Sequence, residues 1–210
     1  MSESVHEISP KVTMNYLKSE IFYGWFKNRA IPGPLLWADA YEKIKMIENI
    51  EEDDDMLNDE GTIDYLSRLS GMDYGAFKKL WDRLTNEQKR EVLDSVIDEL
   101  AFFGIRSLFH RIAFELTYYG IFTGKKFNMK DVAKVVEAAK DYLNKRIDYH
   151  ELMETIANVL WPSEEDKKST AYEDFWRGAD LADYVGDNTL NKIIKEYLVE
   201  KVGNRYSLLS

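Results

Sequence analysis

Apolar residues recur every three or four positions along most of the chain, and this spacing places them on one face of a helix. The row formed by Val92, Val96 and Leu100 is one example, and Leu17, Ile21 and Trp25 form another row in register. The pattern predicts helices over residues 10–28, 35–50, 63–69, 74–84, 86–119, 129–144, 149–160, 171–177, 180–185 and 189–197. The expected fold class is therefore all-α (mainly helical), with an irregular helical bundle over most of the chain.

Polar residues that cap helix N-termini precede many of these segments. We expect N-caps at Ser9, Thr62, Thr85, Asn128, Asp148 and Thr170. Thr85 and Gln88 have the spacing of a capping box. Ile31–Pro34 contains two prolines and should end the first helix, and Gly104 should kink or divide the long helix.

The spacing of apolar residues changes within the last thirty residues. Leu190, Ile193, Ile194 and Tyr197 share one helix face. Beyond Tyr197 the spacing of apolar residues approaches two, and Gly203-Asn204 lies between two runs that favour strands. A Gly-Asn pair in this position predicts a two-residue β-hairpin turn, because glycine adopts positive φ without steric cost.

A short helix, a turn, a second helix and a hairpin occur in this order over residues 179–210, which resembles the winged helix-turn-helix superfamily. Leu181, Ala182, Gly186, Leu190 and Ile193 occupy the positions of its buried residues and turn. The resemblance covers about a sixth of the chain and implies a C-terminal winged helix. The expected domains are a helical bundle over residues 1–161, a polar linker over 162–169 and a winged helix-turn-helix over 170–210.

A second segment has a related spacing. Leu66, Gly71, Phe77 and Leu80 are placed as in a helix-turn-helix, and the interval from Leu66 to Gly71 equals that from Leu181 to Gly186. A short helix that ends in glycine is common, so ordinary helical packing is the favoured interpretation over a second DNA-reading unit.

Composition narrows the class of protein. The chain of 210 residues is 45% hydrophobic and contains no cysteine, which excludes disulfides and thiolate metal sites and favours a cytoplasmic location. The most apolar window, 101–122, contains Arg106, His110, Arg111 and Glu115, so we expect a buried helix there and no membrane span. The net charge of −10 opposes indiscriminate binding to phosphate.

The charge is concentrated in one segment. Residues 51–64 contain eight acidic residues and no basic one. We expect a solvated loop there, because like charges repel one another. Mimicry of phosphate charge toward a basic partner, or binding of a divalent cation, is a less favoured interpretation, and the segment lacks the ligand spacing of a calcium loop.

Motifs of catalysis are missing from the sequence. No glycine-rich phosphate loop follows a predicted strand, and no Gly-x-Ser-x-Gly elbow is present. His150 with Glu154 and His110 with Glu115 are the two candidate acid–base or metal-binding pairs, but the chain has no Glu-x-x-His motif. We expect no enzyme, no metal and no cofactor.

Two hypotheses of function remain. The first is a DNA-binding protein, a transcriptional regulator or accessory factor of DNA metabolism, that contacts double-stranded DNA as a homodimer. The residues expected to contact DNA are Thr189, Asn191, Lys192, Lys195, Lys201, Asn204 and Arg205. Asn191 is the residue placed to read adenine. The alternative is an acidic helical protein–protein interaction module, an adaptor or subunit of a larger complex, without direct DNA contact.

Overall fold

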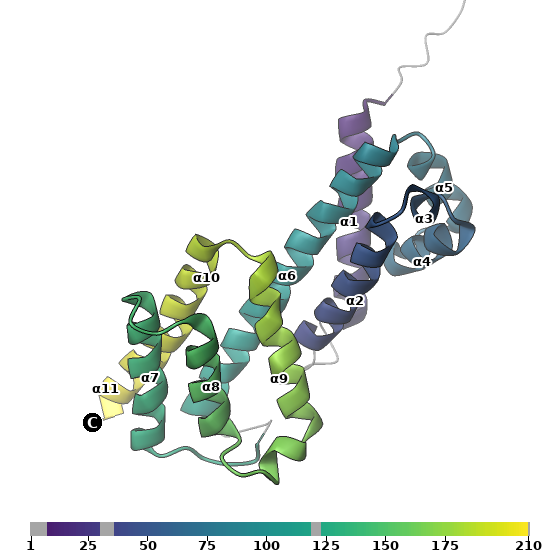
Figure 1. The fold of residues 1–210 in the computed structure, drawn as a ribbon. Coiled ribbons are helices and arrows are strands. Elements are labelled where there is room, and N and C mark those ends of the chain that lie inside the picture. The colour runs from purple at the N-terminus through teal and green to yellow at the C-terminus, as the bar shows by residue number, and fades with distance from the viewer. Residues whose placement is uncertain (1–7, 30–35, 119–122, 210) are drawn as a thin grey trace, which may run out of the picture. The chain divides into compact units, whose positions relative to one another are not determined.

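The computed structural model describes residues 8–29, 36–118 and 123–209, and within these ranges all regular structure is helical (Figure 1). The elements are α1 (Pro10–Arg29), α2 (Leu36–Glu51), α3 (Asp54–Leu57), α4 (Glu60–Ser70), α5 (Tyr74–Trp81), α6 (Asn86–Thr117), α7 (Met129–Leu143), α8 (Tyr149–Leu160), η1 (Asp166–Lys168), α9 (Thr170–Asp180), η2 (Leu181–Tyr184), α10 (Asp187–Ile194), η3 (Lys195–Val202) and α11 (Gly203–Leu209). The predicted all-α fold class is confirmed.

The chain forms two compact units. Unit 1 comprises residues 1–33 and 42–100, and unit 2 comprises residues 34–41 and 101–210. The two long helices α2 and α6 each contribute residues to both units. Residues 162–169, predicted as a linker, lie within unit 2 and include η1, while the predicted domain assignment itself stays a prediction.

Unit 1 is organised around the inner face of α1, which packs on α4 and α5. Leu17, Ile21 and Trp25 are at most 1% exposed on this face. A Cβ atom on Gly24 would lie 2.4 Å from the carbonyl oxygen of Leu69, so α1 approaches the backbone of α4 as closely as only glycine permits. This contact seats α1 firmly and determines which of its faces points away from the unit.

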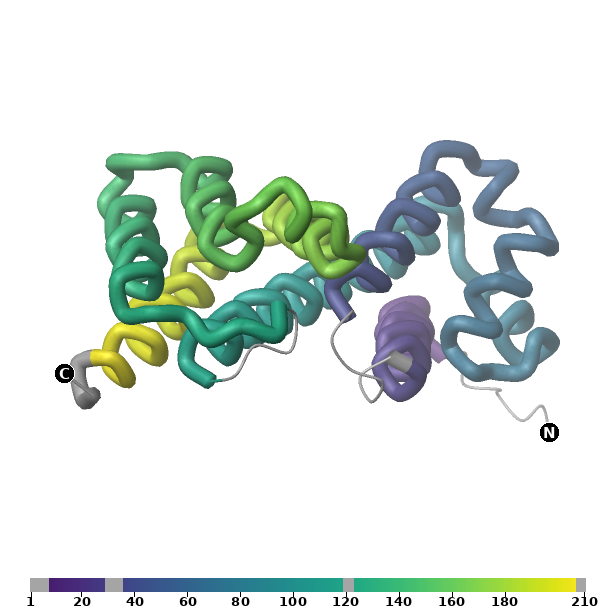
Figure 2. Tube along the Cα trace, turned by 90° about the horizontal axis from the view of Figure 1, so that it is seen from below, coloured from purple at the N-terminus to yellow at the C-terminus, as the bar shows by residue number. Residues whose placement is uncertain are grey.

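Unit 2 has its core between the second half of α6 and the C-terminal helices. Leu108, Phe109 and Phe175 are fully buried. The helix α7 packs against both α8 and η3 (Figure 2). Tyr197 and Val202 of η3 are buried as well, so the end of the chain belongs to this core.

The predicted β-hairpin at the C-terminus is wrong. Residues 187–209 form one helical run, of which α10 and α11 are α-helical and η3 is π-helical (Figure 1). We call this run the C-terminal helix. Gly203 has φ −59°, which is right-handed helical backbone, whereas the predicted turn required a positive φ.

The hairpin prediction failed because Leu198 and Val202 are four residues apart. This spacing places both side chains on one face of a strand and also on one face of a helix. An isolated two-stranded hairpin is marginal in water. A helix that continues past Tyr197 buries Leu198 and Val202 along with Tyr197 and packs η3 against α7. Tertiary packing of this apolar face therefore prevails over the local turn signal.

Most predicted helix starts are confirmed. Thr85 and Gln88 form the capping box, with the Thr85 N–H donating to Oε1 of Gln88 at 3.0 Å. Asn128 and Asp148 accept from the backbone N–H groups of Asp131 and Glu151. The cap predicted at Thr62 is wrong, because Asp59 caps α4, and Ser169 rather than Thr170 caps α9.

Two interruptions of helices were predicted from the sequence, one at Gly104 and one at Ile31–Pro34. The helix α6 runs for 32 residues as one element, so Gly104 does not divide it. A Cβ atom on Gly104 would lie 2.6 Å from Cδ1 of Leu181, and close packing accounts for this glycine. The predicted break at Ile31–Pro34 lies outside the described residues.

Candidate functional site

The residues predicted to contact DNA lie on the C-terminal helix. Thr189, Asn191 and Lys192 belong to α10, Lys195 and Lys201 to η3, and Asn204 and Arg205 to α11. The four basic side chains and Asn204 are exposed, whereas Thr189 and Asn191 are half-buried. The seven side chains thus share one continuous helix, and no wing presents any of them.

Asn191 faces the interior more than the prediction requires. Its Oδ1 atom is buried and has no hydrogen-bond partner among the described residues. Reading adenine needs both the oxygen and the nitrogen of the amide displayed to the base edge. In this position the carbonyl half of the amide is not displayed.

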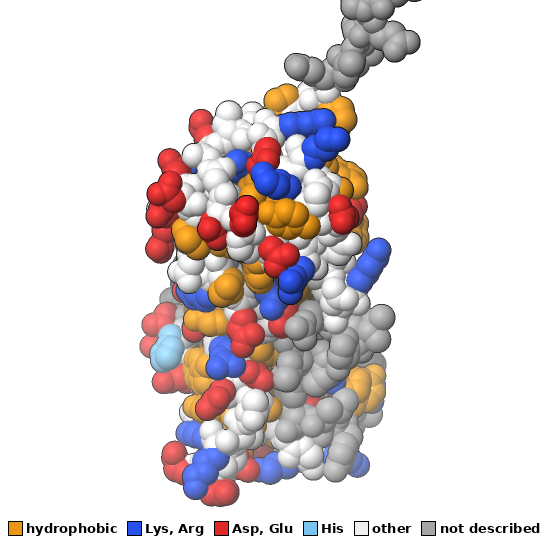
Figure 3. Space-filling model, turned by 90° about the vertical axis from the view of Figure 1, so that its right-hand side faces the viewer, with side chains coloured by type: hydrophobic (Ala, Val, Ile, Leu, Met, Phe, Trp, Pro, Cys, Tyr) orange, Lys and Arg blue, Asp and Glu red, His pale blue; other side chains and the backbone are white. Residues whose placement is uncertain are grey.

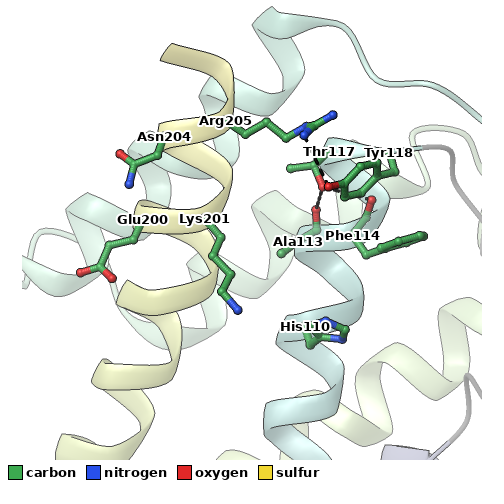
Figure 4. Close-up of a pocket in the computed structure, with 9 residues that line it drawn as sticks. All are labelled: His110, Ala113, Phe114, Thr117, Tyr118, Glu200, Lys201, Asn204 and Arg205. Carbon is green, nitrogen blue, oxygen red and sulfur yellow. Dashed lines mark hydrogen bonds between the residues drawn. The ribbon is translucent and has the colours of Figure 1, made fainter. Parts of the chain in front are cut away.

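Three of the seven residues meet at one pocket of about 460 Å³ in unit 2. Lys201, Asn204 and Arg205 line it from the C-terminal helix, and His110 and Tyr118 line it from the far half of α6 and the residue just beyond (Figure 4). The remaining lining residues are Ala113, Phe114, Thr117 and Glu200. We call this the C-terminal pocket. Thr189, Asn191, Lys192 and Lys195 do not line it.

Aromatic rings hold the two basic side chains at the pocket. The Arg205 guanidinium lies 4.4 Å from the centroid of the Tyr118 ring, and its Nη1 donates to the Tyr118 hydroxyl at 3.4 Å. The Nζ atom of Lys201 lies 4.5 Å from the centroid of the Tyr197 ring and 3.7 Å from a carboxylate oxygen of Glu196. Stacked in this way, a cation keeps its charge and most of its donors while its side chain is confined.

His110 reports the electrostatic character of the pocket. Partial burial lowers the pKa of its imidazole, and the positive charges of Lys201, Arg111 and Arg106 lower it further. Each of these effects disfavours a proton on the ring. The neighbouring positive charges therefore influence the protonation of a side chain that lines the pocket. Sequence reasoning considered His110 with Glu115 as a pair, but Glu115 is buried and accepts from the Thr123 hydroxyl at 3.4 Å.

The acidic segment is not the solvated loop that was predicted. Asp53 caps α3 and Asp59 caps α4, each accepting a backbone N–H. Asp54 forms a salt bridge with Arg90 of α6 within unit 1. Aspartates at helix N-termini satisfy free N–H groups and complement the helix dipole, so these acidic residues build local structure.

An exposed apolar row that the sequence analysis missed lies on the outward face of α1 and shortly before the helix begins. Ile8, Val12, Tyr16 and Tyr23 are between 48% and 58% exposed, and we call them the outer row. Val12, Tyr16 and Tyr23 share one face of α1, opposite to buried Leu17, Ile21 and Trp25, and Ile8 precedes the helix. The signal was present in the sequence, since α1 is apolar on two opposite faces and a solvated helix has one polar face.

A groove of about 820 Å³ in unit 1 borders α1. Lys11, Met14 and Lys18 line one bank, and Glu87 and Glu91 of α6 line the other. The remaining lining residues are Ser9, Pro10, Asn15, Thr85, Gln88, Val92 and Ser95. Most residues that line this groove are polar or charged, and none of them belongs to the outer row.

Other candidate chemistry is sparse in the described part of the chain. His150 and Glu154 form an exposed pair 3.1 Å apart. In residues 8–29, 36–118 and 123–209, no group of three or more histidines and carboxylates is arranged to hold a metal ion. Over the same ranges no helix combines the length and apolar character needed to cross a bilayer. On the face shown in Figure 3, basic side chains are interspersed with acidic and hydrophobic ones and form no continuous strip.

The chain was compared with known proteins at the levels of family, sequence and structure. The resemblance of residues 179–210 to the winged helix-turn-helix superfamily stays a prediction, although its hairpin is wrong. Models of protein families, curated proteins and solved structures give no match to this chain.

Proposed function

We propose that the protein is a helical interaction module that binds, through the outer row of α1, an amphipathic helix of another protein. The observation that supports this most is the apolar character of α1 on two opposite faces. The inner face is fully used in packing on α4 and α5. The outer face carries aliphatic and aromatic side chains that no described element of unit 1 covers.

The alignment of the outer row distinguishes it from ordinary surface. Single exposed apolar side chains are common on proteins and need no explanation. Three of them on one face of α1, with Ile8 shortly before the helix, form a pattern by which helices recognise one another. Complete burial of an aliphatic or aromatic side chain contributes about 1.5–3 kcal/mol, and covering these half-exposed side chains supplies part of that amount for each of them.

Charge indicates the chemistry of the partner. The helix α1 contains four Lys or Arg residues and one Glu, in a chain with net charge −10. Lys11 and Lys27 are exposed beside the outer row. A partner helix with acidic flanks meets favourable charge here, whereas a second copy of α1 would place basic residues against basic residues.

Direct DNA binding stays an untested alternative. Its support was a wing that presents Lys201 and Arg205 to the phosphate backbone, and residues 198–209 are helical instead. The aligned outer row and the net charge favour a protein partner over a polyanion.

Binding of a synthetic amphipathic helix tests the proposal. The probe has Leu at every third or fourth position and Glu on both flanks, and a second peptide carries Lys in place of Glu. We expect micromolar binding of the acidic peptide by fluorescence anisotropy, and at least tenfold weaker binding of the basic one. The double variant Val12→Ser with Tyr16→Ser should lower affinity for the acidic peptide at least tenfold.

Met129→Ser is the matched control, because Met129 is 51% exposed but lies on α7 in unit 2. It should leave the affinity unchanged. Equal binding of both peptides, or no effect of the outer-row variant, would overturn the proposal. Sedimentation of the protein alone identifies the remaining occupant: a dimer that the outer-row variant dissociates would show that a second copy covers this face.

A further inference from the structure

We propose that the C-terminal pocket binds the phosphate group of a small phosphate monoester, separately from any partner of α1. The pocket is lined by His110, Lys201 and Arg205, which come from two helical elements of unit 2 (Figure 4). Asn204 is also part of the lining. The basic residues in this pocket contrast with the net charge of −10 of the whole chain.

The basic groups are suited to an oxyanion. Arg205 uses one N–H toward the Tyr118 hydroxyl at 3.4 Å, and a guanidinium has five N–H donors in a planar fork. Lys201 supplies a point charge, and the imidazole of His110 supplies a third group that donates when protonated. Arginine and lysine together form the usual protein complement to phosphate.

Carboxylates at the pocket compete only weakly for these cations. Glu200 is part of the lining, and Glu196 lies 3.7 Å from Nζ of Lys201. Both residues of the pair between Lys201 and Glu196 are about half exposed, and exposed ion pairs are weak because water screens them. Hydrogen bonds from charged donors to a phosphate dianion are stronger than such an exposed pair.

The shape of the pocket favours an organic phosphate over the free ion. Its volume of about 460 Å³ falls in the range of small-molecule sites, roughly 300–1,000 Å³. Phe114 and Tyr118 form an aromatic wall, with ring centroids 5.0 Å apart. The cations hold the phosphate group while the rings contact the carbon skeleton of the ligand.

Occupation of the pocket has a specific spectroscopic consequence at His110. The neighbouring cations lower the pKa of His110, so an anion among them must raise it. His150 lies on α8 outside the pocket and should not respond. The pH titration of the two histidines by NMR, with and without ligand, therefore distinguishes binding at this site from binding elsewhere.

Calorimetric titration with phenyl phosphate, inorganic phosphate and benzoate tests the proposal. We expect phenyl phosphate to bind at least tenfold more tightly than either of the other probes. Lys201→Met and Arg205→Met should each weaken it tenfold or more and abolish the upward shift of the His110 pKa. Lys195→Met is the matched control on η3, since Lys195 is exposed but outside the pocket, and should change affinity less than twofold.

Several results would overturn the proposal. They are absence of saturable binding up to millimolar phenyl phosphate, equal binding of benzoate, and unchanged binding in both pocket variants. Circular dichroism of each variant verifies the fold, which replacement of an exposed side chain should preserve. The variant Val12→Ser with Tyr16→Ser should still bind phenyl phosphate, so failure of the α1 proposal and failure of this one are separable.

Discussion

At the residue scale, burial and the neighbouring carboxyl of Asp94 shift the pKa of Glu51 in unit 1. Burial, a hydrogen bond that the protonated Glu51 carboxyl donates to Asp94, and the charges of Asp94 and Glu48 together raise the pKa of Glu51 to about 8, while Arg90 opposes the shift. The Oε1 atom of Glu51 is buried and receives no hydrogen bond, which leaves a negative charge there uncompensated. Glu51 is therefore protonated near neutral pH.

A pH-dependent stability follows from this protonation. A carboxyl whose folded pKa exceeds its unfolded value near 4.5 stabilises the fold below pH 4.5 and loses that contribution as pH rises through about 8. We expect the melting temperature to fall between pH 5 and pH 8. Glu51→Gln, which keeps a neutral side chain at every pH, should flatten this dependence.

Glu52→Gln is the control for that measurement, because Glu52 is the exposed neighbour in sequence. Thermal melts followed by circular dichroism at several pH values give the comparison. An identical slope in wild type and Glu51→Gln would show that Glu51 is ionised in the folded protein.

The residue scale also shows where the structure places the candidate site residues. Lys201, Asn204 and Arg205 were expected to contact DNA from a wing, and they line one pocket instead, while their contact with DNA stays a prediction. Asn191 was assigned to the polar helix face, yet its Oδ1 atom is buried. Sequence spacing identifies faces within one helix, but not which neighbouring helix covers their edges.

At the element scale, Gly203 and Gly71 allow a test of whether the C-terminus is helical or forms a hairpin. Gly203 lies in helical backbone, and a Cβ there would make ordinary contact with Val136 at 3.6 Å. Gly71 ends α4 at φ +75°, where an L side chain is strained. The two positions should therefore respond in opposite directions to the same substitution.

We expect Gly203→Ala to raise the free energy of unfolding by about 0.5–1 kcal/mol, because alanine favours a helix interior over glycine. Gly71→Ala should lower it by about 1–2 kcal/mol, because a left-handed conformation is costly for alanine. Urea denaturation measures both. Destabilisation by Gly203→Ala would indicate a positive φ at this position, as in the predicted hairpin.

Most N-caps were predicted correctly from local signals, although the caps at Thr62 and Thr170 and the Gly203-Asn204 turn were wrong. The capping box at Thr85 and Gln88 and the caps at Asn128 and Asp148 involve residues within one helical turn. The acidic segment was misinterpreted because like-charge repulsion was weighed without the capping roles of Asp53 and Asp59. The same carboxylates that repel one another also satisfy the free N–H groups of two successive helices.

At the scale of the whole molecule, net charge governs encounters with nucleic acid. A chain of net charge −10 repels a polyanion unless its basic residues are concentrated on one surface. Lys201 is engaged with Tyr197 and Glu196, and Arg205 with Tyr118. Outside the C-terminal pocket, the exposed cations of the C-terminal helix are Lys192 and Lys195.

We accordingly expect no retardation of random duplex DNA in a gel-shift titration at physiological salt, since too few phosphates would be neutralised. The double variant Lys192→Glu with Lys195→Glu serves as the comparison at low and high salt. Retardation of the wild type that weakens steeply with salt and disappears in this variant would restore the DNA-binding hypothesis.

The sequence by itself determined the helical class, most helix positions and most of the caps, because periodicity and capping act between residues three or four positions apart. Only the tertiary structure decided that residues 198–209 continue as a helix, since burial against α7 outweighs a two-residue turn signal. It also decided that His110 and Lys201 line one pocket although 90 residues separate them in the sequence, and that the described part of unit 1 leaves the outer row exposed. These outcomes depend on which faces meet in space, and that information is distributed over the whole chain.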